Sequence, residues 1–103
     1  MEYFMQITRH DNGNSLTLVV EGVIDSTTAP VFEAELVEAC QKSKNVIVDF
    51  EKVDFISSAG LRALLISQKK MMTTSGKMTL VHVKDDVREV FELTGFISVL
   101  NIA

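Results

Sequence analysis

The sequence predicts a single α/β domain in which an antiparallel hairpin precedes a largely parallel sheet. Strand-like and helix-like periodicities alternate along the chain, an Asn-Gly pair separates the first two strand-like runs, and a length of 103 residues suits one hydrophobic core. A strand, a helix and a further strand in succession form a right-handed crossover, which makes the two strands parallel. We therefore expect one mixed sheet in one domain that spans residues 1–103.

Two strands joined by a tight turn are expected at the N-terminus. Apolar residues alternate or cluster in residues 3–9 and 15–21, and Asn12-Gly13 between them suits a turn with positive φ. Consecutive strands joined by so short a connection pair in the antiparallel direction. The chain is therefore expected to open with a β-hairpin.

The first helix is expected to start at Thr27 or Thr28 and to end near Lys42. Either threonine can cap a helix, and Pro30 is tolerated in the first turn because the amide hydrogen it lacks would have no partner there. The apolar residues at helical spacing are Phe32, Leu36, Ala39 and Cys40. With no second cysteine to pair with, Cys40 is interpreted as a small core residue.

The second half of the chain alternates between strands and helices. We expect a strand at 45–50, a helix at 59–74, a strand at 77–83 and a helix at 85–94. The inward face of the first of these helices is expected to hold Leu61, Leu64, Leu65, Gln68, Met71 and Met72. The last helix is expected to be capped by Asp85 or Asp86 and to turn inward Val87, Val90, Phe91 and Thr94.

Two serines lie where a strand gives way to the helix at 59–74. A serine oxygen at this place can cap the helix, and a phosphate on it would face unpaired amide groups and the positive end of the helix dipole. Ser57 and Ser58 therefore suit a phosphorylation switch. A purely structural cap is the competing interpretation, and position alone leaves both open.

The sequence around these serines resembles the STAS domain of bacterial anti-sigma-factor antagonists, over nearly the whole chain. The segments that carry the resemblance are Gly22-Val23-Ile24-Asp25, Val46-Ile47-Val48-Asp49-Phe50, Ile56-Ser57-Ser58-Ala59-Gly60-Leu61 and Glu92-Leu93-Thr94-Gly95-Phe96. The resemblance implies a mixed sheet with its helices largely on one face. The family's usual pattern is Asp-Ser-Ser/Thr-Gly-Leu, and its phosphorylated serine, two positions before the glycine, matches Ser58. Ser57 replaces the acidic residue, which makes Ser57 the alternative site.

A regulatory function without catalysis follows from the resemblance. It implies that the unmodified domain binds an anti-sigma factor that is also a serine kinase, releases the sigma factor in a transcriptional stress response, and loses this binding when Ser58 is phosphorylated. A PP2C-type phosphatase would reset the switch, and ATP belongs to the kinase, so no cofactor is expected. The residues expected to meet the partner are Asp25, Ser26, Thr27, Asp54, Ile56, Ser57, Ser58, Ala59, Gly60, Leu61 and Arg62.

Two other functions compete with this one. A STAS-type adaptor could serve a different signalling or lipid-transport complex with its serine unmodified. A small serine hydrolase would need His10 or His82 beside Ser58, and the serine lacks the Gly-x-Ser-x-Gly surroundings of a nucleophile elbow. Two histidines and one cysteine also show no metal-ligand spacing, so no metal is expected.

Composition narrows the partners and the location. A net charge of −4 disfavours nucleic acid, whose binding needs clustered Lys and Arg. The N-terminus lacks a signal peptide's basic and apolar regions, and no apolar run approaches the ~20 residues that span a bilayer. We therefore expect a cytoplasmic domain that binds protein and does not insert into a membrane.

Overall fold

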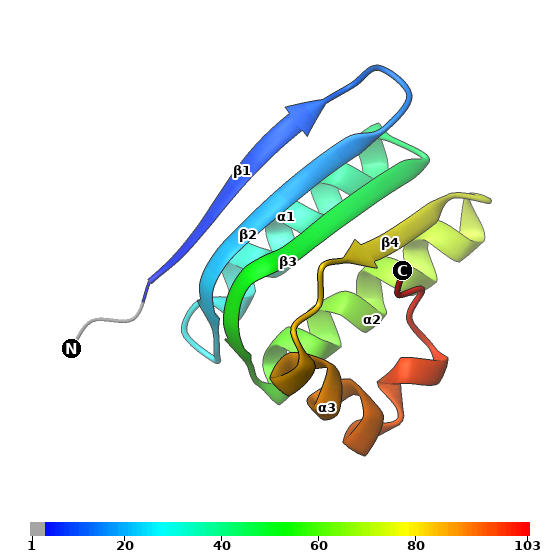
Figure 1. The fold of residues 1–103 in the computed structure, drawn as a ribbon. Coiled ribbons are helices and arrows are strands. Elements are labelled where there is room, and N and C mark those ends of the chain that lie inside the picture. The colour runs from blue at the N-terminus through cyan, green and yellow to red at the C-terminus, as the bar shows by residue number, and fades with distance from the viewer. Residues whose placement is uncertain (1–3) are drawn as a thin grey trace.

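Four strands form one mixed sheet in the order β1-β2-β3-β4 in the computed structural model, which describes residues 4–103 (Figure 1). The strands are β1 (Met5–Asp11), β2 (Leu16–Ile24), β3 (Asn45–Ile56) and β4 (Lys77–Val81). β1 pairs with β2 in the antiparallel direction, whereas β2, β3 and β4 are parallel. The expected mixed sheet with an N-terminal hairpin is confirmed, although residue 3 of the expected first strand lies outside the described residues.

The turn of the hairpin has the backbone that the Asn-Gly pair predicts. Gly13 has a φ of 86°, and its N–H donates to Oδ1 of Asp11 at 2.8 Å. The N–H of Asn12 donates to the carbonyl of Ser15 at 2.9 Å and closes the connection. A positive φ at this position is accessible to glycine at little steric cost.

Three helices cover one face of the sheet, as expected: α1 (Ala29–Lys42), α2 (Ser58–Thr73) and α3 (Asp85–Thr94). Figure 1 shows α1 and α2 together behind the strands. The ring of Phe50 on β3 lies 6.3 Å from that of Phe32 on α1 and 6.3 Å from that of Phe91 on α3, centroid to centroid. Because one side chain of β3 meets both helices, α1 and α3 lie on the same side.

The opposite face of the sheet, called the open face below, carries the half-buried alternate positions of the strands. Along β2, Leu16 and every second residue after it are buried, whereas Thr17 and every second residue after it are half-buried. This alternation is typical of a sheet that packs on a core with one face only. A short 3₁₀ helix at Phe96–Ser98 and a bridge from Ile102 to Leu80 complete the C-terminus.

All four strands end elsewhere than the sequence-based expectation, and β1 and β2 continue to Asp11 and Ile24, past the expected ends at residues 9 and 21. β3 continues to Ile56 instead of ending at residue 50, because it pairs with β2 as far as Ile24 across two register shifts, between Val19 and Glu21 and between Gly22 and Val23. Such bulges bend a strand and re-aim its side chains. β4 ends at Val81, two residues early, because His82 adopts a left-handed φ of 57° that no strand continues.

The helix starts are formed differently from the expected caps. Thr28 occupies the cap position of α1 as expected, but its hydroxyl donates to the carbonyl of Val23 at 2.8 Å and makes no capping bond. Lys84 occupies the cap position of α3, so the expectation of an aspartate cap is wrong. Asp85 and Asp86 lie in the first turn, where negative charge still favours the helix dipole.

The apolar faces of two helices are narrower than expected. Met72 is 68% exposed and Thr94 is also exposed, so the expectation that both face inward is wrong. Leu64 is fully buried, whereas Leu65 is only half-buried. Cys40 is buried as expected, and this burial raises the pKa of its thiol to about 11.

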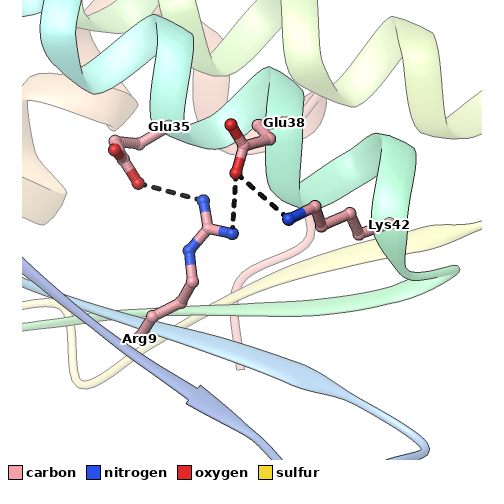
Figure 2. A network of polar contacts seen from close by, with 4 residues as sticks. All are labelled: Arg9, Glu35, Glu38 and Lys42. Carbon is pink, nitrogen blue, oxygen red and sulfur yellow. Dashed lines mark hydrogen bonds and ion pairs between the residues drawn. The ribbon is translucent and has the colours of Figure 1, made fainter.

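An ion-pair network holds edge strand β1 on α1 (Figure 2). The two terminal nitrogens of Arg9 lie 3.0 Å from Oε2 of Glu35 and 3.0 Å from Oε1 of Glu38, and Nζ of Lys42 lies 3.5 Å from the same Glu38 oxygen. The guanidinium thus links β1 to two carboxylates one turn apart on α1, and these ion pairs remain partly exposed to solvent.

Candidate functional site

The expected site lies where β2 and β3 end side by side. These strand ends are remote from the β1–β2 turn in Figure 1. Ile24 and Ile56 are register partners at these strand ends, and the N–H of Ser57 donates to the carbonyl of Ile24 at 2.8 Å. The β2–α1 loop and the start of α2 are therefore neighbours. The structure brings together two segments that are about thirty residues apart in the sequence.

The two serines are in different situations. Ser57 is the N-cap of α2: its backbone is extended, it is half-buried, and its Oγ accepts a hydrogen bond from the N–H of Gly60 at 3.4 Å. Ser58 is the first residue of the helix, is exposed, and makes no side-chain hydrogen bond to any residue between 4 and 103. One serine thus provides the structural cap, and the other presents a free hydroxyl.

Gly60 allows α2 to start directly against the strand ends. A Cβ at this glycine would lie 2.7 Å from Cγ2 of Ile24 and 2.7 Å from Cγ1 of Ile56, well inside van der Waals contact. Gly60, Ile56 and Leu61 are all buried. Because these three expected partner-binding residues are buried, they support the surface of the site and do not form it.

The β2–α1 loop is held by one carboxylate. Oδ1 of Asp25 accepts hydrogen bonds from the N–H groups of Thr27 at 2.9 Å and Thr28 at 3.0 Å, and the N–H of Asp25 donates to Oγ1 of Thr28 at 2.9 Å. This arrangement leaves Ser26 and Thr27 exposed. A shallow hollow lies between the loop and the two helix starts, lined by Ser26, Ala29, Pro30, Glu33, Ala59 and Arg62.

Charged residues of both signs lie on the elements that meet at Ser58. Oδ1 of the exposed Asp54 pairs with Nζ of Lys84 at 3.1 Å, which links the end of β3 to the start of α3. Arg62 lies one turn after Ser58 and forms no ion pair with a residue of the described chain. Sequence reasoning missed Lys84 and Glu33, because each comes from another element and no local pattern connects it with the serines.

The histidines give the serines no catalytic base. His10 lies on β1 opposite Thr17, toward the other end of β2, and Nδ1 of His82 lies 3.2 Å from Oδ1 of Asp49. Neither ring hydrogen-bonds to Ser57 or Ser58. Between residues 4 and 103, no cluster of three His, Cys, Asp or Glu residues could hold a metal ion, and no helix is long and apolar enough to cross a bilayer.

Fold and site together define a small mixed α/β domain with an exposed serine at the start of a helix, where the loops of two parallel strands meet. Residues 5–103 match the sequence model of the STAS domain family. The chain belongs to the STAS domain family, as its sequence predicted.

Relatives of this chain include proteins named for sigma-factor regulation. BtrV of Bordetella bronchiseptica, a proposed anti-sigma factor antagonist, is 37% identical over 100 residues, or 96% of this chain and 86% of BtrV. The anti-sigma-B factor antagonist of Bacillus subtilis is 23% identical over 92 residues, covering 89% of this chain and 84% of that protein.

A solved structure confirms the fold. The crystal structure of an anti-sigma factor antagonist from Mycobacterium paratuberculosis has a TM-score of 0.84 at 23% identity and covers 96% of this chain and 85% of its own. At this identity the likeness concerns the fold alone, and it confirms the STAS-like arrangement of one mixed sheet under helices.

Proposed function

We propose that this chain is an anti-sigma factor antagonist, a regulator without catalytic activity that binds an anti-sigma factor through the surface around Ser58 and thereby releases a sigma factor. Membership of the STAS family and the names of its relatives support this assignment. The observation that carries it is the exposed hydroxyl of Ser58, which makes no hydrogen bond to a described residue, beside a Ser57 that is already used as the helix cap.

The partner is an anti-sigma factor that is also a serine kinase, and it phosphorylates Ser58 in preference to Ser57. Ser57 is half-buried and its oxygen already accepts a hydrogen bond from the N–H of Gly60, so it is less accessible to a kinase than the exposed Ser58. Modification of the Ser58 hydroxyl would break no side-chain hydrogen bond within residues 4–103. The kinase supplies the ATP site, a PP2C-type phosphatase removes the phosphate, and the cycle takes place in the cytoplasm.

The phosphate acts through charge. It adds about two negative charges to a surface where three carboxylates, Asp25, Glu33 and Asp54, already outnumber the cations Arg62 and Lys84, and which the partner must desolvate on binding. A loss of ~3 kcal/mol in binding lowers affinity about a hundredfold. The helix itself tolerates the phosphate, because the N-terminal amides and the dipole of α2 favour an anion there.

The partner contacts fall into two groups. The exposed residues Ser26, Thr27, Asp54, Ser58 and Arg62 touch the partner directly, with the half-buried Asp25, Ser57 and Ala59 between them. The buried Ile56, Gly60 and Leu61 act by setting the position of α2.

Phosphate mapping tests the assignment. Incubation with Mg-ATP and the anti-sigma kinase of the same organism should add one phosphate, and peptide mapping should place it on Ser58. Ser58→Ala should abolish the transfer, whereas the matched control Ser57→Ala should lose ~1 kcal/mol of stability with its cap but still accept phosphate. Phosphate found mainly on Ser57 would contradict the choice of serine.

Calorimetry tests the switch itself. Ser58→Ala should bind the anti-sigma factor like the unmodified chain, whereas Ser58→Asp should bind more weakly. Equal affinities of the two variants would exclude the charge mechanism. No binding to any anti-sigma factor, together with an unmodified serine in cells, would favour the adaptor function instead.

A further inference from the structure

Three apolar side chains form a row on the open face, at the same end of the sheet as Ser58. Val23 on β2 is the register partner of Phe55 on β3, and its N–H donates to the carbonyl of Phe4 at 3.2 Å. Phe4 is 57% exposed and Phe55 is 50% exposed, while Val23 between them is half-buried. We call Phe4, Val23 and Phe55 the open-face patch.

Two backbone irregularities produce this patch. Gly22 has a φ of 107°, and a Cβ at this position would collide with the carbonyl of Phe4, so only glycine lets the N-terminal segment lie so close. The register of β3 shifts beside Gly22, so that Asp54 and Phe55 are both exposed in succession, between the buried Val53 and Ile56. A regular strand would have turned one of the two exposed residues toward the core.

Two residues of the open-face patch also line a hollow that has a carboxylate on either side. Val23, Phe55, Asp25 and Asp54 line this hollow. All hydrogen bonds that the side chain of Asp25 accepts go to Oδ1, and Asp54 uses Oδ1 for Lys84, so the second oxygen of each carboxylate has no partner among the described residues. An apolar floor between two carboxylates fits an apolar side chain that has a Lys or Arg beside it.

We propose that the open-face patch is a docking site for the anti-sigma partner, which inserts an apolar side chain next to a basic residue. The proposal rests on the proposed function and extends the partner surface from Ser58 around the end of the sheet. Phe55 precedes the serine pair by two residues, so one partner surface can cover both. A second copy of this chain fits less well, because a twofold contact through the patch would bring like carboxylates together.

The test compares exposed apolar residues on and off the patch. Phe55→Ser should weaken binding of the unphosphorylated chain to the anti-sigma protein at least tenfold in calorimetry. Met72→Ser, at a site on α2 that is even more exposed than Phe55, should change it less than twofold. Phe4→Ser provides a second patch variant should Phe55→Ser fail to fold. Wild-type affinity in the folded patch variants would overturn the docking site while leaving the proposed function intact.

Charge variants test the basic residue of the partner. Asp54→Asn should weaken binding, whereas Lys84→Gln, which also breaks the pair but keeps the carboxylate, should bind as well as the wild type or better. The opposite order would overturn the proposal. So would self-association of the wild type in sedimentation that Phe55→Ser abolishes, because the occupant would then be a second copy. A wild-type chain that binds no anti-sigma factor would refute the proposed function and, with it, this occupant.

Discussion

Replacement of Gly60 by alanine tests how tightly α2 is seated on the ends of β2 and β3. The new Cβ would lie 2.7 Å from methyl and methylene carbons of Ile24 and Ile56, both buried β-branched side chains that cannot swing aside. Ordinary carbon contacts are about 3.5–4.0 Å, so the helix start must move by roughly 0.8 Å or more.

Two opposing effects set the size of the change. Overpacking of a dense core costs about 1–3 kcal/mol. Alanine is the better helix former, which returns about 0.5–1 kcal/mol, and the backbone of Gly60 is not left-handed, so no conformational strain is added. The steric effect is larger, and we expect a net loss of about 1–2 kcal/mol.

Urea unfolding measures this loss. With a slope of about 1–2 kcal/mol per molar for a domain of this size, the midpoint of Gly60→Ala should fall by about 1 M. Ser58→Ala is the matched control in the same helical turn, and its midpoint should stay within about 0.3 M, because the exposed Ser58 hydroxyl makes no hydrogen bond in the described chain. An unchanged or raised midpoint for Gly60→Ala would refute the close seating of α2 on the strand ends.

Four further outcomes are expected. Leu64→Ala, at a fully buried position, should cost about 2–5 kcal/mol in urea unfolding, and Leu65→Ala, at a half-buried one, clearly less. Ser67→Ala should raise the unfolding midpoint, because the buried Ser67 hydroxyl has no hydrogen-bond partner among the described residues. Because the pKa of Cys40 is raised in the folded state, the thiol of the unfolded chain ionises at lower pH. The free energy of unfolding, measured relative to Cys40→Ala, should therefore fall as pH rises from 9.0 toward about 11. Native Cys40 should also alkylate slowly at neutral pH. Phosphoserine at position 58 should shift only amide resonances near the start of α2 and the adjoining loops, and changes throughout the sheet would mean that the core reorganises.

The sequence was sufficient for the order of the strands and α-helices, and the family resemblance added that the helices lie on one face of the sheet. The hairpin and the three helices depend on local periodicity and on a single Asn-Gly turn, which are properties of neighbouring residues. The serine junction was also foreseen, since Ser57 is the cap and Ser58 starts the helix.

Features that depend on contacts between distant segments were not foreseen. The register shifts of β3 arise from its pairing with β2, and they decide that Phe55 faces solvent. The pairing of Asp54 with Lys84 joins residues thirty positions apart. Asp25 organises the loop before α1 through backbone geometry that residue types alone do not specify.

The capping role of Ser57 gives this chain a distinct electrostatic resting state. Aspartate, the acid expected at this position from the family pattern, caps a helix about as well as serine, so either residue keeps α2 in place. The choice between them alters charge without altering architecture. With serine, the unmodified surface carries one negative charge fewer, so the proposed phosphorylation of Ser58 would change the local charge by a larger proportion. In the proposed switch, the residue at the cap would therefore set the difference in charge between the bound and released forms.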